Sequence, residues 1–438
     1  MRTAQDNLWL DTHYEAGSAL SGDHETDVAI IGGGVTGLSS AYFIKQRFPK
    51  KRVMVLESEY IGYGSSGRNL GLTSSVLGNN VLPILKNRGI ENTRRFYRLS
   101  LNAISLVKQL VKEHRIDCGY EDTGVLDIVQ TNRELRLLDK KAKAYESIGV
   151  EFTWLDSAKA QDRFQGTKIL AALYLPEDKI FDPARLVRGL ARAAKSLGVE
   201  VYEHSRCTHV EPGPTISLYT SLARVRANDI VVATNAYSNP LGLFRYKVVP
   251  FYTYNIATEP LTQVQLDALG WPHREPVKNQ KYLFWTIRLT SDNRVALNDA
   301  NPLYFYDIDR DYSYWPKVLR LHCELLTRVF PCLKGVKVTH QWGGRLGITL
   351  DFLPSIGCRG KQRNIYYSMG YNGHGVAFAC LAGKMIAELM AGERTELTDH
   401  PLINKSIFGV PSASLTYLGS NGLIKYFKLY DRWLDMGS

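Results

Sequence analysis

The sequence has no recognisable export signal and no membrane-spanning segment. Acidic side chains recur from Asp6 to Glu25, and this stretch contains no apolar core of a signal peptide. No uncharged apolar run reaches the ~18 residues that a membrane-spanning helix needs. The 6 cysteines form no Cys-x-x-Cys pair and have no histidine at zinc-ligand spacing. We therefore expect a protein of the reduced cytoplasm without a metal site.

Long runs of like charge are missing as well. Lys and Arg number 54 and Asp and Glu 43, which gives a net charge of +11, but the basic residues are scattered. Nucleic-acid binding is therefore not indicated, and the charge by itself names no partner. With 45% hydrophobic and 22% charged residues over 438 positions, the chain has the composition of a globular protein with room for two or three domains.

The N-terminal part predicts a βαβ unit. Residues 26–31 and 52–57 are short apolar runs typical of strands, and residues 36–48 between them have a helical pattern that stops before Pro49. The two strands should be parallel and joined by a right-handed crossover. The chain is thus predicted to open with an α/β nucleotide-binding domain.

The later segments alternate between α/β and antiparallel patterns. Helices are predicted at residues 91–114, 183–197, 316–330 and 376–390, and strands at 199–203, 229–234 and 336–342. Aromatic and β-branched residues predict an antiparallel sheet from residues 248–258, 281–289 and 294–298, with a turn at 291–293. An α/β start and finish that bracket antiparallel strands indicate one domain built from separated segments.

A glycine-rich turn follows the first strand. Residues 32–37 read G-x-G-x-x-G, in which Gly32 permits a tight turn, Gly34 lets a pyrophosphate approach, and Gly37 lets the helix pack on the strand. Val35 and Thr36 complete the turn at the helix N-terminus, where the dipole favours phosphate. Glu57 ends the second strand 20 residues after Gly37, where its carboxylate can accept from both ribose hydroxyls. The site predicts FAD or NAD and disfavours NADP.

A second loop of small residues, 62–69, directly follows the acidic strand. It holds hydroxyl and amide donors and one cation, in Ser65, Ser66, Arg68 and Asn69. Such a loop suits a second polar part of the same ligand, and a flexible surface loop is the alternative.

Several motifs together resemble one family. They are residues 8–11 (LWLD), 28–31 (VAII), 66–69 (SGRN), 181–183 (FDP), 231–237 (VVATNAY), 342–344 (WGG) and 370–376 (GYNGHGV). With them the chain resembles the FAD-dependent amine and amino-acid oxidoreductases of the D-amino-acid-oxidase superfamily, and within it the gamma-glutamylputrescine oxidase-like enzymes. The resemblance implies a discontinuous α/β FAD-binding domain of Rossmann type and an α+β substrate domain with an antiparallel sheet.

The resemblance also implies which residues meet the cofactor. The three glycines of the turn would hold the pyrophosphate and Glu57 the adenosine ribose. Ser65, Ser66, Arg68 and Asn69 would hold the phosphates and the flavin side. Gly373, His374 and Gly375 would meet the isoalloxazine, although His374 could instead only cap its helix, and Gly344 and Val376 are further cofactor-binding candidates. Residues 342–354 hold no cysteine, so FAD is expected to be bound non-covalently. Leu70-Gly71 stands where the family commonly has two glycines, which concerns the substrate more than the fold.

The chemistry implied is oxidation of a small amine or amino acid, with oxygen or another electron acceptor completing the cycle. Candidate catalytic residues are His374, Tyr252 and Tyr254 on one strand face, Arg288 as a carboxylate-binding arginine, and Lys281 as a flavin-facing lysine that assists oxygen reduction. The alternatives are core packing for the tyrosines and a solvated surface position for Arg288.

The predicted FAD-binding domain comprises residues 23–80, 180–245 and 342–400, and the substrate domain residues 81–179 and 246–341. Residues 401–438 form a tail with an amphipathic helix that could dock on the protein or lie on an anionic membrane surface. A different class of function stays open, a non-catalytic or accessory FAD protein that acts with a partner, because the net charge of +11 suits an acidic protein contact.

Overall fold

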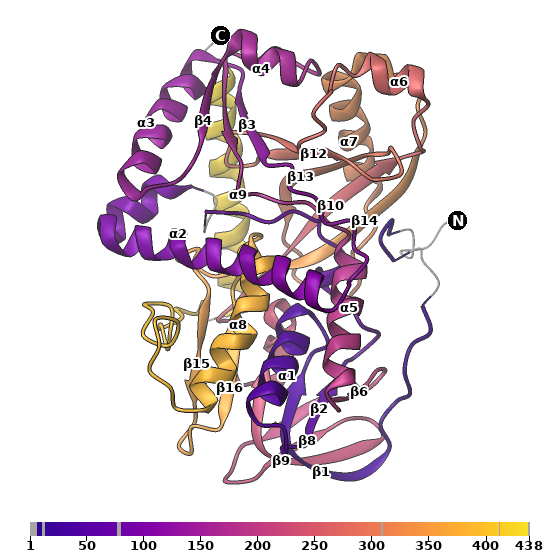
Figure 1. The fold of residues 1–438 in the computed structure, drawn as a ribbon, viewed down its shortest axis with the longest axis vertical. Coiled ribbons are helices and arrows are strands. Elements are labelled where there is room, and N and C mark those ends of the chain that lie inside the picture. The colour runs from indigo at the N-terminus through magenta and orange to yellow at the C-terminus, as the bar shows by residue number, and fades with distance from the viewer. Residues whose placement is uncertain (1–6, 11–13, 77–79, 308–309, 411, 437–438) are drawn as a thin grey trace.

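Two eight-stranded sheets organise the chain (Figure 1). The computed structural model describes residues 7–10, 14–76, 80–307, 310–410 and 412–436. Asp11, the last residue of the motif at residues 8–11, lies outside the described residues. In Figure 1 the first sheet lies in the lower part of the molecule and the second in the upper part, and helix α2 runs between them.

The first sheet is mainly parallel. Its order is β15-β16-β9-β1-β2-β6, and β7 and β8 join it through β9. β1 pairs with β2 in parallel, with Val28 opposite Val53, which confirms the predicted βαβ unit. The strands are β1 (Gly22–Ile31), β2 (Val53–Leu56), β6 (Glu200–Tyr202), β7 (His209–Glu211), β8 (Ile216–Tyr219), β9 (Ala223–Val232), β15 (Ser355–Arg359) and β16 (Ile365–Met369). β2 is buried throughout, as is typical of a parallel strand covered on both faces.

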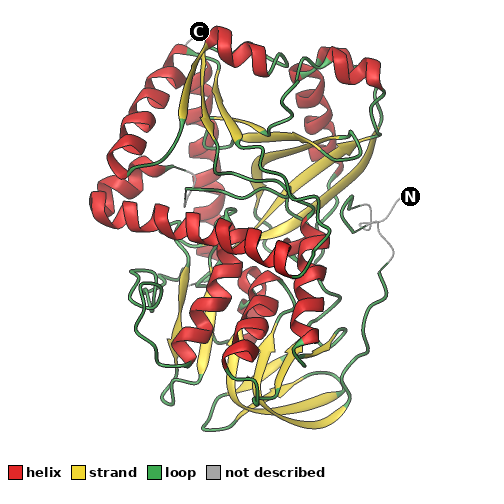
Figure 2. Cartoon of the chain, in the orientation of Figure 1, coloured by secondary structure: helices red, strands yellow, loops and turns green. Residues whose placement is uncertain are grey.

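Helices α1 (Val35–Arg47), α5 (Pro183–Ser196) and α8 (Gly375–Met390) cover one face of this sheet (Figure 2). α5 begins as the sequence predicts, because Asp182 accepts from the Arg185 N–H at 3.0 Å and Pro183 occupies the first position. α1 and α8 pack closely at Gly383, where an added Cβ would lie 2.5 Å from the backbone of Ser39. This contact holds α1 and α8 side by side on the same face of the sheet.

Helix α2 (Val81–Glu113) is longer than predicted. Asn80 accepts from the Leu82 N–H, and the helix is kinked at Gly89, whose φ is 75°. Pro83 and Gly89 interrupt the helical pattern of this first part, so the sequence predicts the helix only from residue 91. Its residues Phe96 and Ile104 belong to the core of the first sheet, and Tyr97 to a smaller core under α3 (Asn132–Ile148). α2 therefore joins the two halves of the molecule.

The second sheet is mainly antiparallel. Its order is β14-β10-β13-β12-β11-β3-β5-β4, with β11 and β3 parallel. The strands are β3 (Val125–Val129), β4 (Thr153–Asp156), β5 (Ala171–Leu175), β10 (Val249–Thr258), β11 (Val277–Asn279), β12 (Trp285–Leu289), β13 (Val295–Leu303) and β14 (Val338–Ile348). Helices α4 (Ser157–Arg163), α6 (Gln263–Ala268) and α7 (Pro316–Val329) accompany it. The predicted antiparallel sheet is thus present, but sequence patterning missed β3, β4, β5 and β11.

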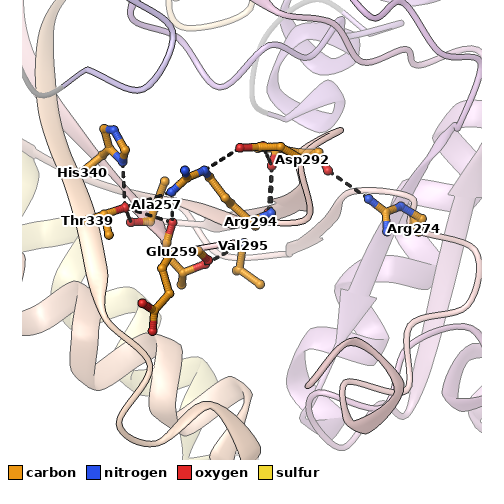
Figure 3. A network of polar contacts seen from close by, with 10 residues as sticks. Ala257, Glu259, Arg274, Asp292, Arg294, Val295, Thr339 and His340 are labelled. Carbon is orange, nitrogen blue, oxygen red and sulfur yellow. Dashed lines mark hydrogen bonds and ion pairs between the residues drawn. The ribbon is translucent and has the colours of Figure 1, made fainter. Parts of the chain in front are cut away.

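A polar network fixes one end of this sheet (Figure 3). Arg294 donates to the Thr258 carbonyl at 2.8 Å, to Asp292 at 2.6 Å and to Thr339 at 3.1 Å. Arg274 donates to the Thr290 carbonyl at 2.9 Å. The network ties the β12–β13 turn, predicted at residues 291–293, to β10 and β14.

Two observed elements cross the predicted division into domains. α2 falls in segment 81–179, yet much of it packs with α1 and α8 on the first sheet. β14 runs across position 342 and pairs along its length with β10 of the second sheet. The pairing of β14 brings residues 343–346 to the junction between the sheets.

The C-terminal helix α9 (Ala413–Asp435) docks on the protein. Ser412 accepts from the Leu415 N–H at its start, and Ile424, Asp431 and Leu434 are buried. Docking leaves Tyr426 and Trp433 on the outer side of this helix, where they are 56% and 48% exposed. Across the described residues, no helix is both long and apolar enough to cross a membrane.

Candidate active site and cofactor site

A cavity of about 430 Å³ lies at the carboxyl ends of β1, β2 and β9. This is where a doubly wound sheet binds ligands. Of the predicted cofactor residues, Gly37 and His374 are the two that do not line it. Those that do are Gly32, Gly34, Val35, Thr36, Glu57, Ser65, Ser66, Arg68, Asn69, Gly344, Gly373, Gly375 and Val376. Residues from five separate chain segments therefore meet around one elongated cavity.

The glycine turn has the tight geometry that its pattern predicts. Gly32 has a φ of 108°, which a side chain would strain, and a Cβ on Gly37 would lie 1.9 Å from the Gly32 carbonyl oxygen. Gly37 thus acts through packing and not by lining the cavity. The turn leaves backbone N–H groups and the α1 N-terminus facing the space where a pyrophosphate fits.

Glu57 lies at one end of the cavity and is 9% exposed. Its Oε2 accepts from the Gly33 N–H at 2.6 Å and its Oε1 from the Glu59 N–H at 3.1 Å. Burial raises the pKa of this carboxyl, and the two N–H groups act in the opposite direction. Arg206 and Cys207 line the same end, and neither was singled out from the sequence.

The second loop is built into the protein and is not a flexible surface loop. Ser66 Oγ accepts from the Val35 N–H at 3.0 Å, which links the loop to the glycine turn. Asn69 donates to the carbonyls of Ser65 and Ser66, both at 3.0 Å. Arg68 donates to the Tyr63 carbonyl at 2.6 Å and to the Gly343 carbonyl at 3.0 Å. The arginine therefore joins the loop to β14 of the second sheet.

A second cavity, of about 240 Å³, adjoins the first. Both are lined by Ser65, Arg68, Asn69, Gly344, Arg345, Leu346, Gly373 and Val376. The remaining walls of the second cavity come from the second sheet, from the chain around Tyr282 and from α9. Two ligands bound in the two cavities would meet at the shared wall.

His374 lies on the second cavity at the N-terminus of α8. Its Nδ1 is 3.1 Å from the Asn372 carbonyl oxygen. A carbonyl only accepts, so Nδ1 carries the proton and Nε2 has the lone pair. Burial lowers the pKa of His374 to about 4, and nearby Lys278 contributes to the shift. The imidazole is therefore neutral at physiological pH.

Tyr252 and Tyr254 share one face of β10, as predicted, with ring centroids 6.4 Å apart. That face does not line the second cavity, which is a correction to the expected substrate site. Tyr254 donates to the Tyr312 carbonyl at 2.8 Å, while Tyr252 accepts from Arg345 at 2.8 Å and lines the first cavity. The opposite face of β10 lines the second cavity, through Phe251, Thr253 and Asn255. Alternation predicts a shared face but cannot say which face it is.

Arg288 is neither a substrate ligand nor a solvated surface residue. It is 3% exposed, and its Nη1 donates to the carbonyls of Leu70, Gly71 and Phe181 at 2.7 to 3.0 Å. Burial lowers its pKa to about 10. The expected carboxylate-binding role is wrong, because Arg288 lines neither cavity and its guanidinium is engaged by these carbonyls.

The lysine on the second cavity is Lys278, not Lys281. Lys281 lies 2.5 Å from Asp435 of α9 in an ion pair. Lys278 on β11 lines the cavity and lies 3.1 Å from Asp127 Oδ1. Sequence reasoning missed it because the strand was predicted to begin at 281, although Val277-Lys278-Asn279 alternates as a short strand does.

Lys278 belongs to a buried group of charges. The Asp127 carboxylate is fully buried and also lies 2.6 Å from Lys141. The two ammonium groups keep the pKa of Asp127 below its usual value despite its burial. Asp178 lines the same cavity, and burial raises its pKa to about 6. Two cations, Lys141 and Lys278, and two carboxyl groups, Asp127 and Asp178, thus lie at this side of the second cavity.

A mainly parallel sheet with a dinucleotide turn, joined to an antiparallel sheet that walls a second cavity, defines a dinucleotide-dependent oxidoreductase. Residues 27–389 match the family model DAO, described as FAD dependent oxidoreductase. The chain belongs to this family. It is therefore an FAD-dependent enzyme of the amine and amino-acid oxidoreductases.

Relatives agree with this assignment. The chain is 31% identical to the gamma-glutamylputrescine oxidoreductase of Escherichia coli strain K12, over 84% of each chain. It is 26% identical to the probable oxidoreductase OrdL of Haemophilus influenzae, over 93% of this chain and 92% of that one. The crystal structure of glycine oxidase from Geobacillus kaustophilus shares the fold, with a TM-score of 0.73 and 22% identity over 89% of this chain and 100% of that chain.

The first cavity fits FAD chemically. Glu57 is an acceptor at one end, the α1 N-terminus and the small-residue loop offer donors in the middle, and the α8 N-terminus lies at the other end. Cys358 and Cys380, the cysteines that follow residues 342–354, line neither cavity. Cys358 Sγ donates to the Arg363 carbonyl, and Cys380 is buried within α8.

Proposed function

We propose that the protein oxidises the carbon–nitrogen bond of a small amine or amino acid, with FAD bound non-covalently. The observation that carries the proposal is the wall shared by the two cavities, where a substrate carbon would face the cofactor. When bound, FAD would supply the acceptor for the hydride, which carries the electron pair of the C–H bond beside the nitrogen; the nitrogen loses a proton, and water hydrolyses the product imine.

His374 would orient the substrate amine. Its lone pair on Nε2 can accept an N–H of a neutral amine, while the Asn372 carbonyl holds the other nitrogen protonated. A pKa of about 4 makes the imidazole a poor base, so its contribution is position and not proton removal. This fits a reaction in which the protein mainly positions the reactants.

Lys278 would supply the positive charge that the sequence analysis assigned to Lys281. An ammonium at the second cavity stabilises the anion that dioxygen becomes on accepting an electron. Asp127 holds this ammonium in place. Each of the two charges would be costly to bury without the other, so the pair stays together. We assign oxygen as the acceptor on this basis.

The cavity favours an amine whose reacting nitrogen is remote from any carboxylate. The arginines of its lining already have protein partners, Tyr63 and Gly343 for Arg68 and Tyr252 and Arg310 for Arg345. An α-amino acid would need a bidentate arginine beside the reacting carbon, and the Lys278 ammonium of this cavity is already paired with Asp127. A gamma-glutamylated amine, the substrate that the name of the Escherichia coli relative states, carries its carboxylate at the far end. The accessory-protein alternative has no such support from the relatives.

Anaerobic titration of the purified holoenzyme tests the proposal. Polyamines, gamma-glutamylated amines, N-methyl amino acids and D-amino acids are added in turn, and the flavin absorbance is followed. We expect bleaching by the gamma-glutamylated amines and rapid recovery with peroxide when oxygen is admitted. A fully loaded flavin that no compound bleaches would contradict the proposal.

The outer face of α9 supports a contact with an anionic membrane surface. Leu418, Leu429 and Trp433 are 67%, 64% and 48% exposed, and Lys425 and Arg432 lie on the same exposed side. This is the composition of a helix that lies in a membrane interface. We expect co-sedimentation with phosphatidylglycerol vesicles and not with phosphatidylcholine vesicles. Equal recovery with both, or unchanged recovery after Leu429→Glu with Trp433→Glu, would contradict the contact.

A further inference from the structure

The C-terminal helix α9 closes one side of the second cavity. It follows the segment matched by the family model, which ends at residue 389. Three of its side chains, Leu423, Ile424 and Phe427, nevertheless line the cavity together with Asn298 and His374. A substrate in this cavity would therefore touch a segment that the family's shared sequence does not include.

The helix is held by specific contacts to the loop before β12. The Asp431 carboxylate accepts from the N–H groups of Tyr282 and Leu283 at 3.0 and 2.9 Å. The rings of Phe427 and Tyr282 are stacked, with centroids 4.6 Å apart and planes 8° apart. Lys281, considered above as a catalytic residue, forms its ion pair with Asp435 of the same helix. Tyr282 and Leu283 also line the cavity, so one unit of helix and loop forms this wall.

The wall is apolar where α9 contributes. Leu423, Ile424 and Phe427 present only hydrocarbon to the cavity, whose polar lining includes His374 and Lys278. An extended amine with its nitrogen at this polar lining would lay its methylene chain along this wall. Each methylene that gains contact there strengthens binding by about 4-fold. A methylene for which the cavity has no room weakens binding by a larger factor, because it forces the wall to shift.

We propose that α9 is the specificity wall of the enzyme, with Phe427 and Ile424 setting the length of aliphatic chain that a substrate amine can carry. This proposal rests on the proposed function, since it assigns the second cavity to substrate. Stacking on Tyr282 fixes the Phe427 ring, so the limit on length is sharp. Chain length, and not charge, is what this wall discriminates.

The test compares Phe427→Ala and Ile424→Ala with Leu429→Ala, a matched truncation on the same helix that is 64% exposed. Two homologous series are titrated anaerobically into each holoenzyme. One consists of primary n-alkylamines, and the other of linear diamines that carry a gamma-glutamyl group on one nitrogen. The dependence of the flavin bleaching rate on amine concentration gives the Kd, because without oxygen each flavin is reduced only once. We expect the optimal chain to lengthen by two or three methylenes in the Phe427 variant, and Leu429→Ala to match the wild type.

A second readout does not depend on any amine. Acrylamide quenching of the bound flavin's fluorescence should rise in Phe427→Ala, because the cavity opens, and stay unchanged in Leu429→Ala. Phe427→Leu, which keeps an apolar side chain, should restore most of the wild-type length preference if the alanine variant loses helix docking. Identical length profiles in wild type, Phe427→Ala and Leu429→Ala would overturn the specificity wall.

The two failures are distinguishable. If the wild-type flavin responds to no amine, the proposed function fails, and the length preference fails with it, whatever the quenching shows. If the wild type responds but the variants keep its profile, the proposed function stands and α9 has no part in specificity.

Discussion

The Lys278 ammonium lies 3.1 Å from Asp127 Oδ1, and Lys141 lies 2.6 Å from Oδ2 of the same carboxylate. Lys278 can therefore be removed without leaving Asp127 unpaired. We expect Lys278→Met to fold normally and to slow flavin reoxidation by oxygen about 10²-fold, the scale of losing one stabilising group for a developing anion. Stopped-flow mixing of the reduced enzyme with oxygen measures it.

Lys281→Met is the matched control, because that ammonium pairs with Asp435 of α9 and does not line the second cavity. It should reoxidise at the wild-type rate. Equal rates in both variants would remove Lys278 from the proposed reaction.

Glu57→Gln should weaken FAD binding. The amide cannot replace a carboxylate that accepts from the Gly33 and Glu59 N–H groups, and a hydrogen bond to a charged group contributes about 1.5–3 kcal/mol. We expect the Kd for FAD to rise about 10- to 100-fold, as measured by fluorescence of released flavin. Glu59→Gln, whose side chain pairs with Arg206 and does not line the cavity, should bind FAD as the wild type does.

Arg288→Ala should reduce stability and leave substrate preference alone. The change removes donors from the buried carbonyls of Leu70, Gly71 and Phe181. The Gly71 carbonyl keeps the Phe181 N–H at 3.0 Å, whereas leaving the other two carbonyls unpaired costs about 1–3 kcal/mol each, so we expect a lower Tm in thermal unfolding. A normal Tm with selective loss of carboxylated substrates would restore the role that the sequence suggested.

His322 gives a pH dependence that is separate from the active site. It is 1% exposed on α7, neither ring nitrogen has a hydrogen-bond partner among the described residues, and burial lowers its pKa to about 4. Between pH 6.5 and about 4 the unfolded chain binds a proton that the folded chain does not, so this residue lowers stability as the pH falls through that window. The lost stability approaches about 3 kcal/mol at pH 4.

His322→Leu should remove this loss of stability at low pH. The gap in free energy of unfolding between pH 7.5 and pH 5 should be smaller in the variant than in the wild type, measured by urea denaturation. Parallel curves for the two proteins would show that His322 is not the group responsible.

Local sequence determined the cofactor half of the protein. The glycine turn, its following helix and Glu57 are neighbours in the chain, and their spacing encodes the geometry directly, because tight turns and helix N-termini form from adjacent residues. The resemblance then placed residues 342–376 beside them, although they lie far along the chain.

The substrate half was decided by tertiary structure. Whether β10 turns Tyr252 or Thr253 toward the second cavity depends on what packs on each face, and the alternation of a strand is the same in both cases. Lys278 meets His374, and α9 meets Tyr282, only because the second sheet pairs strands from distant segments. Local pattern determined which residues can bind a dinucleotide, whereas long-range packing decided which side chains face the substrate, because a cavity is made by walls that no short stretch of sequence contains.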